Sequence, residues 1–285
     1  MDMEWIERLN SAISYMEAHL TEELDYEALG RIACCSSYHF QRMFTYMAGI
    51  PLSEYIRRRK MSLAAVDLQA GGEKIIDIAA KYGYQSPTAF NRAFQSIHGI
   101  APSAVRGEGA TVRTYPPLTF QIRIKGVEAM QYRIETRDAF RIVGVSCPMA
   151  KSIEQNFTEV PMLRQKAAVD GTISRLTGMM GEAPAGILGV CACCGGEDWK
   201  YYIAVASRKD AGGLEEYTVP AATWAVFNGE GECPMAIQEL ERRIVTEWLP
   251  TSGYEYADGP DVELYQTQDP KNAKFEVWIP VVRRK

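Results

Sequence analysis

Two stretches of sequence decide the fold of the first hundred residues: EALGRIACCSSYHFQRMFTYMAGIPLS at 27–53 and DIAAKYGYQSPTAFNRAFQSIHGIAPS at 77–103. Shifted by 50 positions, they align without a gap. The matched pairs include Ser36 with Ser86, Phe40 with Phe90, Arg42 with Arg92, Phe44 with Phe94 and Gly49 with Gly99. Each copy has a short helix, a turn and a second helix that a serine side chain can cap. The sequence therefore predicts two helix-turn-helix units.

The segment between the two copies also has helical periodicity. Apolar residues recur through residues 53–69, and Gly71 and Gly72 follow as a stop. A rigid helix here would hold the two units at one spacing. Both second helices could then enter successive major grooves, about 34 Å apart on one face of a duplex.

The polar faces of the two second helices supply the candidate DNA-binding residues. Gln and Asn can pair with adenine and Arg with guanine, while capping serines and helix N-termini hold phosphates. The candidates are Ser36, Ser37, Tyr38, Gln41 and Arg42 in the first copy and Gln85, Ser86, Pro87, Thr88, Asn91 and Arg92 in the second. The alternative interpretation is a solvated helix face without a partner.

The charge distribution favours DNA locally, although the whole chain is acidic with a net charge of −5. Residues 31–106 hold ten basic residues against four acidic ones, whereas residues 1–30 hold one against eight. A partner responds to the local field rather than to the total charge. Double-stranded DNA is therefore the expected partner of residues 31–106.

Residues 5–106 resemble the DNA-binding domain of the AraC family of bacterial transcription regulators. The resemblance rests on Phe40-Gln41-Arg42-Met43-Phe44, Phe90-Asn91-Arg92-Ala93-Phe94 and Gly99-Ile100-Ala101-Pro102-Ser103. It implies a sequence-specific transcription regulator, with RNA polymerase as a further partner. One position departs from the family. Ala33 stands where the family has the glycine matched here by Gly83, and an alanine with positive φ there would cost about 1 kcal/mol.

A chain of 285 residues that is 47% hydrophobic is long enough for two domains. Glycines and prolines predict a linker at 107–129 between a domain at 1–106 and one at 130–285. The second half has the order strand (132–147), helix (157–176), strands (186–193 and 200–206), then strand (222–228), helix (234–248), strands (262–267 and 275–282). The predicted fold is an all-α double helix-turn-helix domain followed by an α+β domain. The latter has two βαββ repeats that form one antiparallel sheet with the helices on one face.

A ligand site is expected where the two repeats meet. In the strand DVELY at 261–265, alternation puts Val262 and Leu264 on one face and Glu263 with Tyr265 on the other. If Val262 and Leu264 face the helices, Glu263 faces a crevice beside aromatic rings, which suits a cationic or amphipathic small molecule. The effector-binding candidates are Glu263, Tyr265, Trp224, Tyr202 and Trp278. The alternative is an edge-strand glutamate in water.

Residues 132–285 resemble the GyrI-like effector-binding domain, on segments 217–227, 262–265 and 277–281. The resemblance implies a small-molecule effector that meets a glutamate at the position of Glu263. A tryptophan often found in the first helix of this family is absent, and Leu163-Arg164 occupies its place. Some members are hydrolases, so an enzyme with Glu263 as base and Tyr202 or Tyr265 as partner is the rival interpretation. Fusion to a DNA-binding domain favours sensing, and we expect no enzyme activity.

Other chemistry has weaker signals. All three histidines lie in the first half, which argues against histidine-based catalysis in the second. Cys191, Cys193 and Cys194 lack the C-x-x-C spacing of zinc sites, so packing is favoured over a soft-metal or thiol sensor, and no metal or cofactor is expected. The seven cysteines have no framework spacing, the N-terminus is acidic, and no apolar run reaches about 20 residues. These features predict a reduced, cytoplasmic protein without membrane association.

Overall fold

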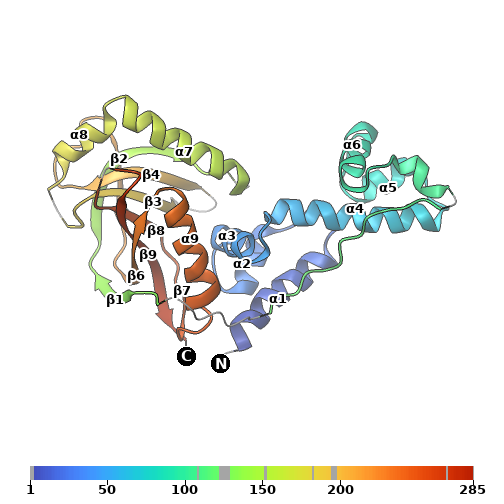
Figure 1. The fold of residues 1–285 in the computed structure, drawn as a ribbon, viewed down its shortest axis with the longest axis horizontal. Coiled ribbons are helices and arrows are strands. Elements are labelled where there is room, and N and C mark those ends of the chain that lie inside the picture. The colour runs from blue at the N-terminus through green and yellow to red at the C-terminus, as the bar shows by residue number, and fades with distance from the viewer. Residues whose placement is uncertain are drawn as a thin grey trace. The chain divides into compact units, whose positions relative to one another are not determined.

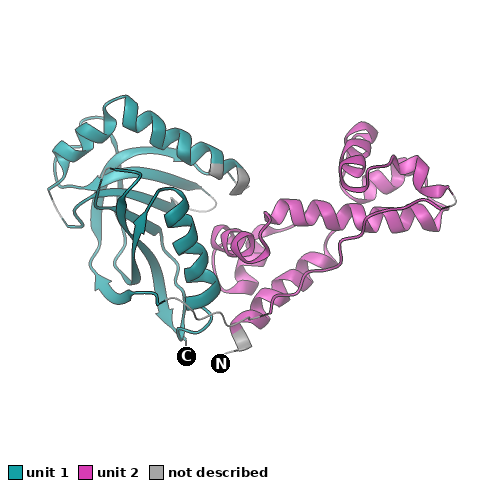
Figure 2. Ribbon diagram, in the orientation of Figure 1, with its two compact units in different colours: residues 1–2, 123–285 teal, residues 3–122 magenta. Residues whose placement is uncertain are grey.

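The computed structural model describes residues 3–107, 109–121, 129–150, 153–181, 183–193, 198–267 and 269–284. The chain divides into a helical unit at 3–122 and a second unit formed by 123–285 with residues 1–2 (Figure 2). Every helix among the described residues is too short or too polar to cross a bilayer.

The helical unit contains the two predicted helix-turn-helix copies and the helix that joins them (Figure 1). Its elements are α1 (Met3–Ala18), α2 (Tyr26–Ala33), α3 (Ser37–Ala48), α4 (Leu52–Ala70), α5 (Ile75–Lys81), α6 (Pro87–His98) and a 3₁₀ turn at Pro102–Arg106. The first copy is α2 with α3, and the second is α5 with α6. The joining helix α4 has 19 residues and is therefore about 28 Å long.

The repeated residues have the same roles in both copies. The Ser36 side chain accepts a hydrogen bond from the backbone N–H of His39 at 3.1 Å, and Ser86 occupies the same position at the start of α6. Gly49 and Gly99 end α3 and α6 with φ of 70° and 77°. The second helices therefore begin and end at equivalent residues.

The first turn differs from the prediction at Ala33. Ala33 is the last residue of α2, and the left-handed conformation falls one residue later, on Cys34, with φ 56°. In the second copy Gly83 has φ 84°. The strain expected for Ala33 is therefore present at Cys34, because a Cβ atom in this conformation crowds the following carbonyl oxygen.

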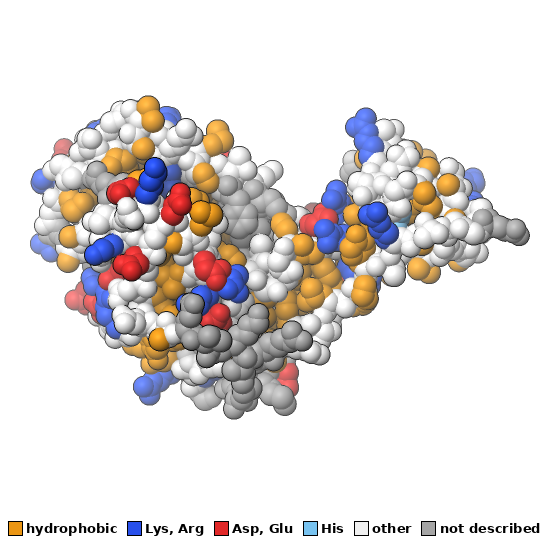
Figure 3. All heavy atoms as spheres, in the orientation of Figure 1, with side chains coloured by type: hydrophobic (Ala, Val, Ile, Leu, Met, Phe, Trp, Pro, Cys, Tyr) orange, Lys and Arg blue, Asp and Glu red, His pale blue; other side chains and the backbone are white. Residues whose placement is uncertain are grey.

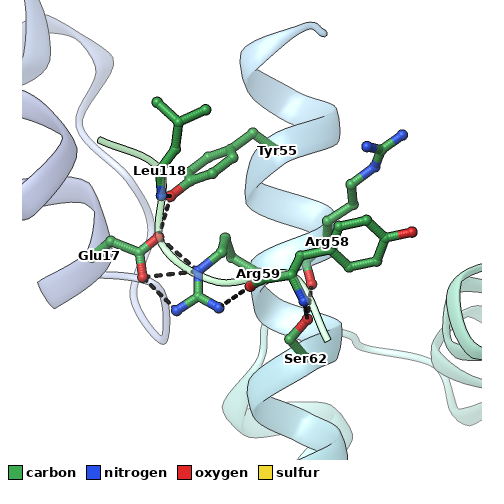
Figure 4. A network of polar contacts seen from close by, with 7 residues as sticks. Glu17, Tyr55, Arg58, Arg59, Ser62 and Leu118 are labelled. Carbon is green, nitrogen blue, oxygen red and sulfur yellow. Dashed lines mark hydrogen bonds and ion pairs between the residues drawn. The ribbon is translucent and has the colours of Figure 1, made fainter. Parts of the chain in front are cut away.

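Residues 109–121, part of the predicted linker, run along the helical unit. The backbone of Phe120 exchanges two hydrogen bonds with the Asn10 side chain of α1, at 2.8 and 3.1 Å. The Leu118 N–H donates to the Tyr55 hydroxyl of α4 at 3.0 Å (Figure 4). Side chains of α1 and α4 thus hold this extended segment in place.

A buried ion pair supports the same segment (Figure 4). Arg59 of α4 binds Glu17 of α1 at 2.8 Å, and their side chains are 7% and 17% exposed. Arg59 also donates to the Tyr115 carbonyl, and Tyr55 donates to Glu17 at 2.7 Å. Arg59 and Tyr55 of α4 therefore connect the Glu17 carboxylate of α1 with the backbone of the segment at 109–121.

The second unit is an antiparallel sheet with helices (Figure 1). Its elements are β1 (Tyr132–Arg137), β2 (Phe140–Pro148), α7 (Ile153–Val169), α8 (Thr172–Met179), β3 (Ile187–Cys193), β4 (Trp199–Ala206), β5 (Glu215–Val219), β6 (Ala222–Gly231), α9 (Met235–Arg243) continued by a π-helical turn (Ile244–Trp248), β7 (Tyr254–Tyr256), β8 (Asp261–Tyr265) and β9 (Ala273–Arg283). The strand order is β1-β6-β9-β8-β3-β4-β2-β5, and β7 pairs with β9. The two predicted βαββ repeats, β2-α7-α8-β3-β4 and β6-α9-β8-β9, meet where β3 pairs with β8.

Some predicted boundaries differ in the structure. The helix expected at 157–176 is two helices, because Gly171, with φ 84°, separates α7 from α8. The strand expected at 132–147 is also two strands, since β1 pairs with β6 while β2 pairs with β4 and β5. The short strands β5 and β7 were not predicted.

One face of the sheet forms a closed aromatic and aliphatic core. Trp224, Trp278 and Val262 are fully buried there, together with Leu264. The ring centroids of Phe140 on β2 and Trp278 on β9 lie 6.5 Å apart although three strands separate β2 from β9. The sheet therefore curls so that this face encloses its own core.

The helices lie on the opposite face. Arg164 of α7 contacts Glu263, and Trp248 packs edge-on against Phe227 at 4.9 Å. Both Glu263 and Phe227 are paired with Val277, so they share one face. The condition that Val262 and Leu264 face the helices is therefore not met, and Glu263 lies on the face that the helices cover.

Candidate DNA interface and effector site

The second helix-turn-helix copy presents the predicted polar face to solvent. Gln85, Ser86, Pro87, Thr88 and Arg92 are exposed, and Asn91 is half-buried. The phenylalanines at 90 and 94 are fully buried in the core of the helical unit. The apolar spacing on α6 thus turns its polar side chains away from that core.

In the first copy, several candidates already have partners within the helical unit. Ser37 donates to Glu27 of α2 at 2.5 Å, and the Arg42 guanidinium lies 5.8 Å from the Tyr46 ring. Tyr38 is half-buried, whereas Ser37, Gln41 and Arg42 are buried. Substitutions in α6 therefore give cleaner tests of DNA contact than substitutions in α3.

The three arginines of the basic run on α4, residues 57–60, form ion pairs with two different glutamates. Arg57 and Arg58 bind Glu54 at 2.5 and 2.6 Å, whereas Arg59 is buried against Glu17. Burial lowers the pKa of Lys60. Figure 3 shows Lys and Arg side chains on the visible surface of the α4–α6 region. Arg57, which is exposed, is the member of this run best placed for phosphate.

In the second unit, Glu263 lies at the centre of a polar cluster under α7. Its Oε2 atom accepts hydrogen bonds from the hydroxyls of Tyr201 and Tyr265, both at 3.0 Å. The Arg164 guanidinium donates to the same oxygen and to the Tyr201 hydroxyl. The cluster therefore draws residues from α7, β4 and β8.

The protonation states follow from burial and from the neighbouring charges. Burial raises the pKa of Tyr201 and of Tyr265 well above the usual value, and Glu263 raises each further, so both phenols remain donors. Burial opposes the charge on Arg164, but the Glu263 carboxylate and the hydrogen bond to the Tyr201 hydroxyl outweigh burial and raise the pKa of Arg164. The cluster thus pairs a guanidinium with a carboxylate between two neutral phenols.

A glycine provides the space for this cluster. Gly189 on β3 pairs directly with Glu263 on β8. A Cβ atom at 189 would lie 2.6 Å from both Glu263 Oε2 and Arg164 Nη2, and in contact with the Tyr201 hydroxyl. Because such distances are too short for carbon, a side chain at 189 would force the Arg164, Glu263 and Tyr201 side chains to shift.

The other three effector candidates lie on the opposite face of the sheet. Tyr202, Trp224 and Trp278 belong to the closed core, where Tyr202 stacks on Tyr217 at 5.5 Å. The Trp278 indole donates to Glu276 at 2.7 Å. The structure thus brings Tyr265 to Glu263 and separates the other three from it.

Sequence reasoning missed two members of the cluster, Tyr201 and Arg164. The sequence did contain a signal for Tyr201: adjacent residues of a strand point to opposite faces, so only one of Tyr201 and Tyr202 can share a face with Glu263. That choice depends on the β3–β4 register, in which Tyr201 is opposite Cys191. At Arg164 the sequence shows only that Leu163-Arg164 replaces the tryptophan often found in the first helix of the family.

The predicted packing role of Cys191, Cys193 and Cys194 can be compared with the structure for the first two residues. Cys191 is buried and Cys193 is half-buried, and Cys194 lies outside the described residues. Within the described part of the chain, no three His, Cys, Asp or Glu side chains are grouped to hold a metal ion.

Comparison with known proteins places both units in families. Residues 133–281, just over half of the chain, match the family described as integron-associated effector binding protein, and residues 29–108 match the helix-turn-helix domain family. The transcriptional activator AarP of Providencia stuartii is 36% identical over 98 residues, which are 34% of this chain and 73% of AarP. The right origin-binding protein of Escherichia coli K12 is 29% identical over 149 residues, 52% of this chain and 50% of that protein.

A putative transcription regulation protein of Staphylococcus aureus MU50 has a solved structure that aligns with 54% of this chain and 99% of its own, with 23% identity and a TM-score of 0.49. A duplicated helix-turn-helix beside a two-repeat α+β unit is the architecture of a transcription regulator with its own effector-binding domain. The chain belongs to the AraC-type transcription regulators, and its second unit is a GyrI-like effector-binding domain of the integron-associated type.

Proposed function

We propose that the chain is a sequence-specific DNA-binding regulator whose domain at 1–106 binds duplex DNA and whose domain at 130–285, after a linker at 107–129, senses a small molecule. The main support is the duplication: α3 and α6 begin at equivalent serine caps, and one continuous helix, α4, joins the two helix-turn-helix copies. Such a pair can contact two successive major grooves from one chain. RNA polymerase is the further partner expected of a transcription regulator.

The proposed DNA contacts are the predicted residues of both copies, with the second copy as the more exposed set. Asn91 and Arg92 on α6 would contact base edges, and Ser86 with the N-terminal end of α6 would contact phosphate. Selection of bound sequences from a random duplex pool tests this proposal. Replacing Arg92 with Ala should cost about 1 to 3 kcal/mol of binding free energy and relax selectivity at one base pair.

The proposed effector is an amphipathic or cationic small molecule that binds at Glu263. The support is a carboxylate with two tyrosine donors at the junction of the repeats. A ligand there regulates DNA binding only if it prefers one of two conformations of the protein. Selection repeated with pooled ligands tests sensing, and Glu263→Gln should weaken cationic ligands more than neutral analogues.

A hydrolase that uses Glu263 and Tyr265 is the second candidate. The hydrogen bond between these two residues satisfies its geometric requirement, whereas Tyr202 is on the wrong face. Sensing is the better-supported function because the curated relatives are regulators. Incubation with ester and other electrophilic substrates, followed by product analysis, separates the two.

A further inference from the structure

The cluster around Glu263 already contains a cation. The Arg164 guanidinium carbon lies 4.4 Å from the Tyr265 ring centroid and 5.3 Å from that of Tyr201. These distances are within the range of cation–π attraction. The same guanidinium is paired with Glu263, and the two side chains are 31% and 19% exposed. Two aromatic rings and a carboxylate thus surround one planar cation that belongs to the protein.

The space for this cation is provided by several separate elements. Gly189 on β3 keeps open the position that a Cβ atom would take from Arg164 Nη2. Tyr201 comes from β4, and Glu263 with Tyr265 comes from β8. Because three strands shape the space and α7 only inserts into it, the strands form the receptor and Arg164 is the occupant.

This occupant differs from the other arginines of the sheet. Arg133 pairs with Glu276 at 3.0 Å, but it lies on the edge strand β1, and its side chain is 42% exposed. Arg164 instead reaches the sheet from a helix, so its withdrawal requires movement of a side chain or of α7 and no break in strand pairing.

We propose that Arg164 is a tethered cation that occupies the effector site, so that a cationic effector binds Glu263 only by displacing it. This inference rests on the proposed function of the Glu263 site. Arg164 and Glu263 neutralise one another, and a second cation beside the guanidinium would be repelled. Displacement breaks the contact that Arg164 makes between α7 and the sheet. The loss of this contact distinguishes the ligand-bound protein from the free protein.

When a side chain of the protein occupies a site most of the time, a competing ligand binds with its intrinsic affinity multiplied by the fraction of time that the site is open. Removing the occupant should therefore increase the affinity for cations, although it deletes a contact residue of the site. If the guanidinium occupies the site at least nine-tenths of the time, its removal increases the affinity for cations about tenfold or more.

The experiment measures binding of p-aminobenzamidine, a planar fluorescent amidinium that resembles a guanidinium, to the full chain by fluorescence titration. Arg164→Ala opens the site, and Arg164→Gln retains most of the side-chain bulk without the charge. Lys166→Ala is the matched control, because Lys166 is exposed on the same helix and its removal changes the net charge equally. The neutral analogue p-aminobenzamide reports whether charge is recognised.

We expect Arg164→Ala to bind the amidinium at least tenfold more tightly than the wild type, Arg164→Gln to show a gain in the same direction, and Lys166→Ala to match the wild type. Addition of Glu263→Gln to Arg164→Ala should abolish the gain, and the neutral analogue should show none. Equal or weaker binding by Arg164→Ala, or a gain that survives Glu263→Gln, would overturn the proposal. An absence of amidinium binding in every variant overturns it too, whereas the proposed function is judged separately, by DNA selection with the ligand pool.

Discussion

Gly189 and Glu263 face one another across the β3–β8 ladder, which is the line where the two βαββ repeats join. The missing side chain of one residue creates the room in which the carboxylate of the other meets Arg164 and Tyr201. The candidate effector site is therefore a property of the junction and requires both repeats.

Replacing Gly189 with Ala should disrupt this junction. The added methyl group would overlap Glu263 and Arg164, and such overpacking costs about 1 to 3 kcal/mol. Chemical unfolding of the full chain measures the loss. Gly178→Ala on α8 is the control, because a Cβ atom there meets nothing within 4 Å and alanine favours a helix. Equal unfolding free energies for the two variants would contradict the packing of the cluster.

The first turn should become more stable when Cys34 is replaced with Gly. Cys34 is exposed and has φ 56°, so glycine relieves about 1 kcal/mol of backbone strain without removing a buried side chain. Thermal unfolding should shift upward. Cys34→Ala keeps the Cβ atom and should show no comparable gain. A gain of the same size in both variants would show that the thiol, and not the backbone, limits stability.

The helical unit should lose stability as the pH falls through the titration of His98. Burial lowers the pKa of His98 below its usual value of 6.5, while its ring nitrogen Nε2 lies 3.1 Å from the Met61 carbonyl. The unfolded chain therefore takes up a proton at a pH where the folded chain does not. The stabilisation is complete above about pH 6.5 and declines as the pH falls toward the lowered value.

Urea unfolding between pH 7.5 and 5 measures this slope. The His98→Gln variant has no group to titrate at this position, so its unfolding free energy should decline less steeply over the same range. Identical slopes in the two proteins would show that His98 is not responsible.

The attachment of the extended segment at 109–121 to the helical unit should depend on the charge of Glu17. Glu17→Gln leaves Arg59 buried without its counterion, which costs about 3 kcal/mol. Hydrogen exchange of α4 amides in the full chain should report the loss. Glu54→Gln removes the more exposed pairs with Arg57 and Arg58 and should cost less than about 1 kcal/mol. If the two substitutions cost the same, the network in Figure 4 does not hold the segment.

The sequence predicted the helical unit well because its signals are local. Serine caps and glycine ends recur at a fixed offset, and each acts within a few residues, as Ser36 and Gly49 show. The position of the left-handed residue in the first turn, Cys34 in place of Ala33, depends on how α2 ends against α3. The repeat alone does not predict the position of this left-handed residue, because it depends on tertiary contacts.

The effector cluster was only half predicted, for a physical reason. Alternation along β8 shows that Glu263 and Tyr265 share a face, but it cannot say which face the helices cover. Tyr202, Trp224 and Trp278 lie on the other face because of the cross-strand register, which alternation along one strand does not reveal. Arg164 comes from a helix 99 residues away, and no local pattern connects it to Glu263.

The most direct test of the central claim is the affinity of the full chain for a selected duplex before and after five base pairs are inserted between its two half-sites. The claim is that one rigid α4 holds two DNA-contacting helices about one turn of duplex apart. Half a turn of added rotation would leave only one helix engaged, so binding should weaken about 100-fold or more while remaining salt-dependent. Equal affinity for both duplexes would contradict the account.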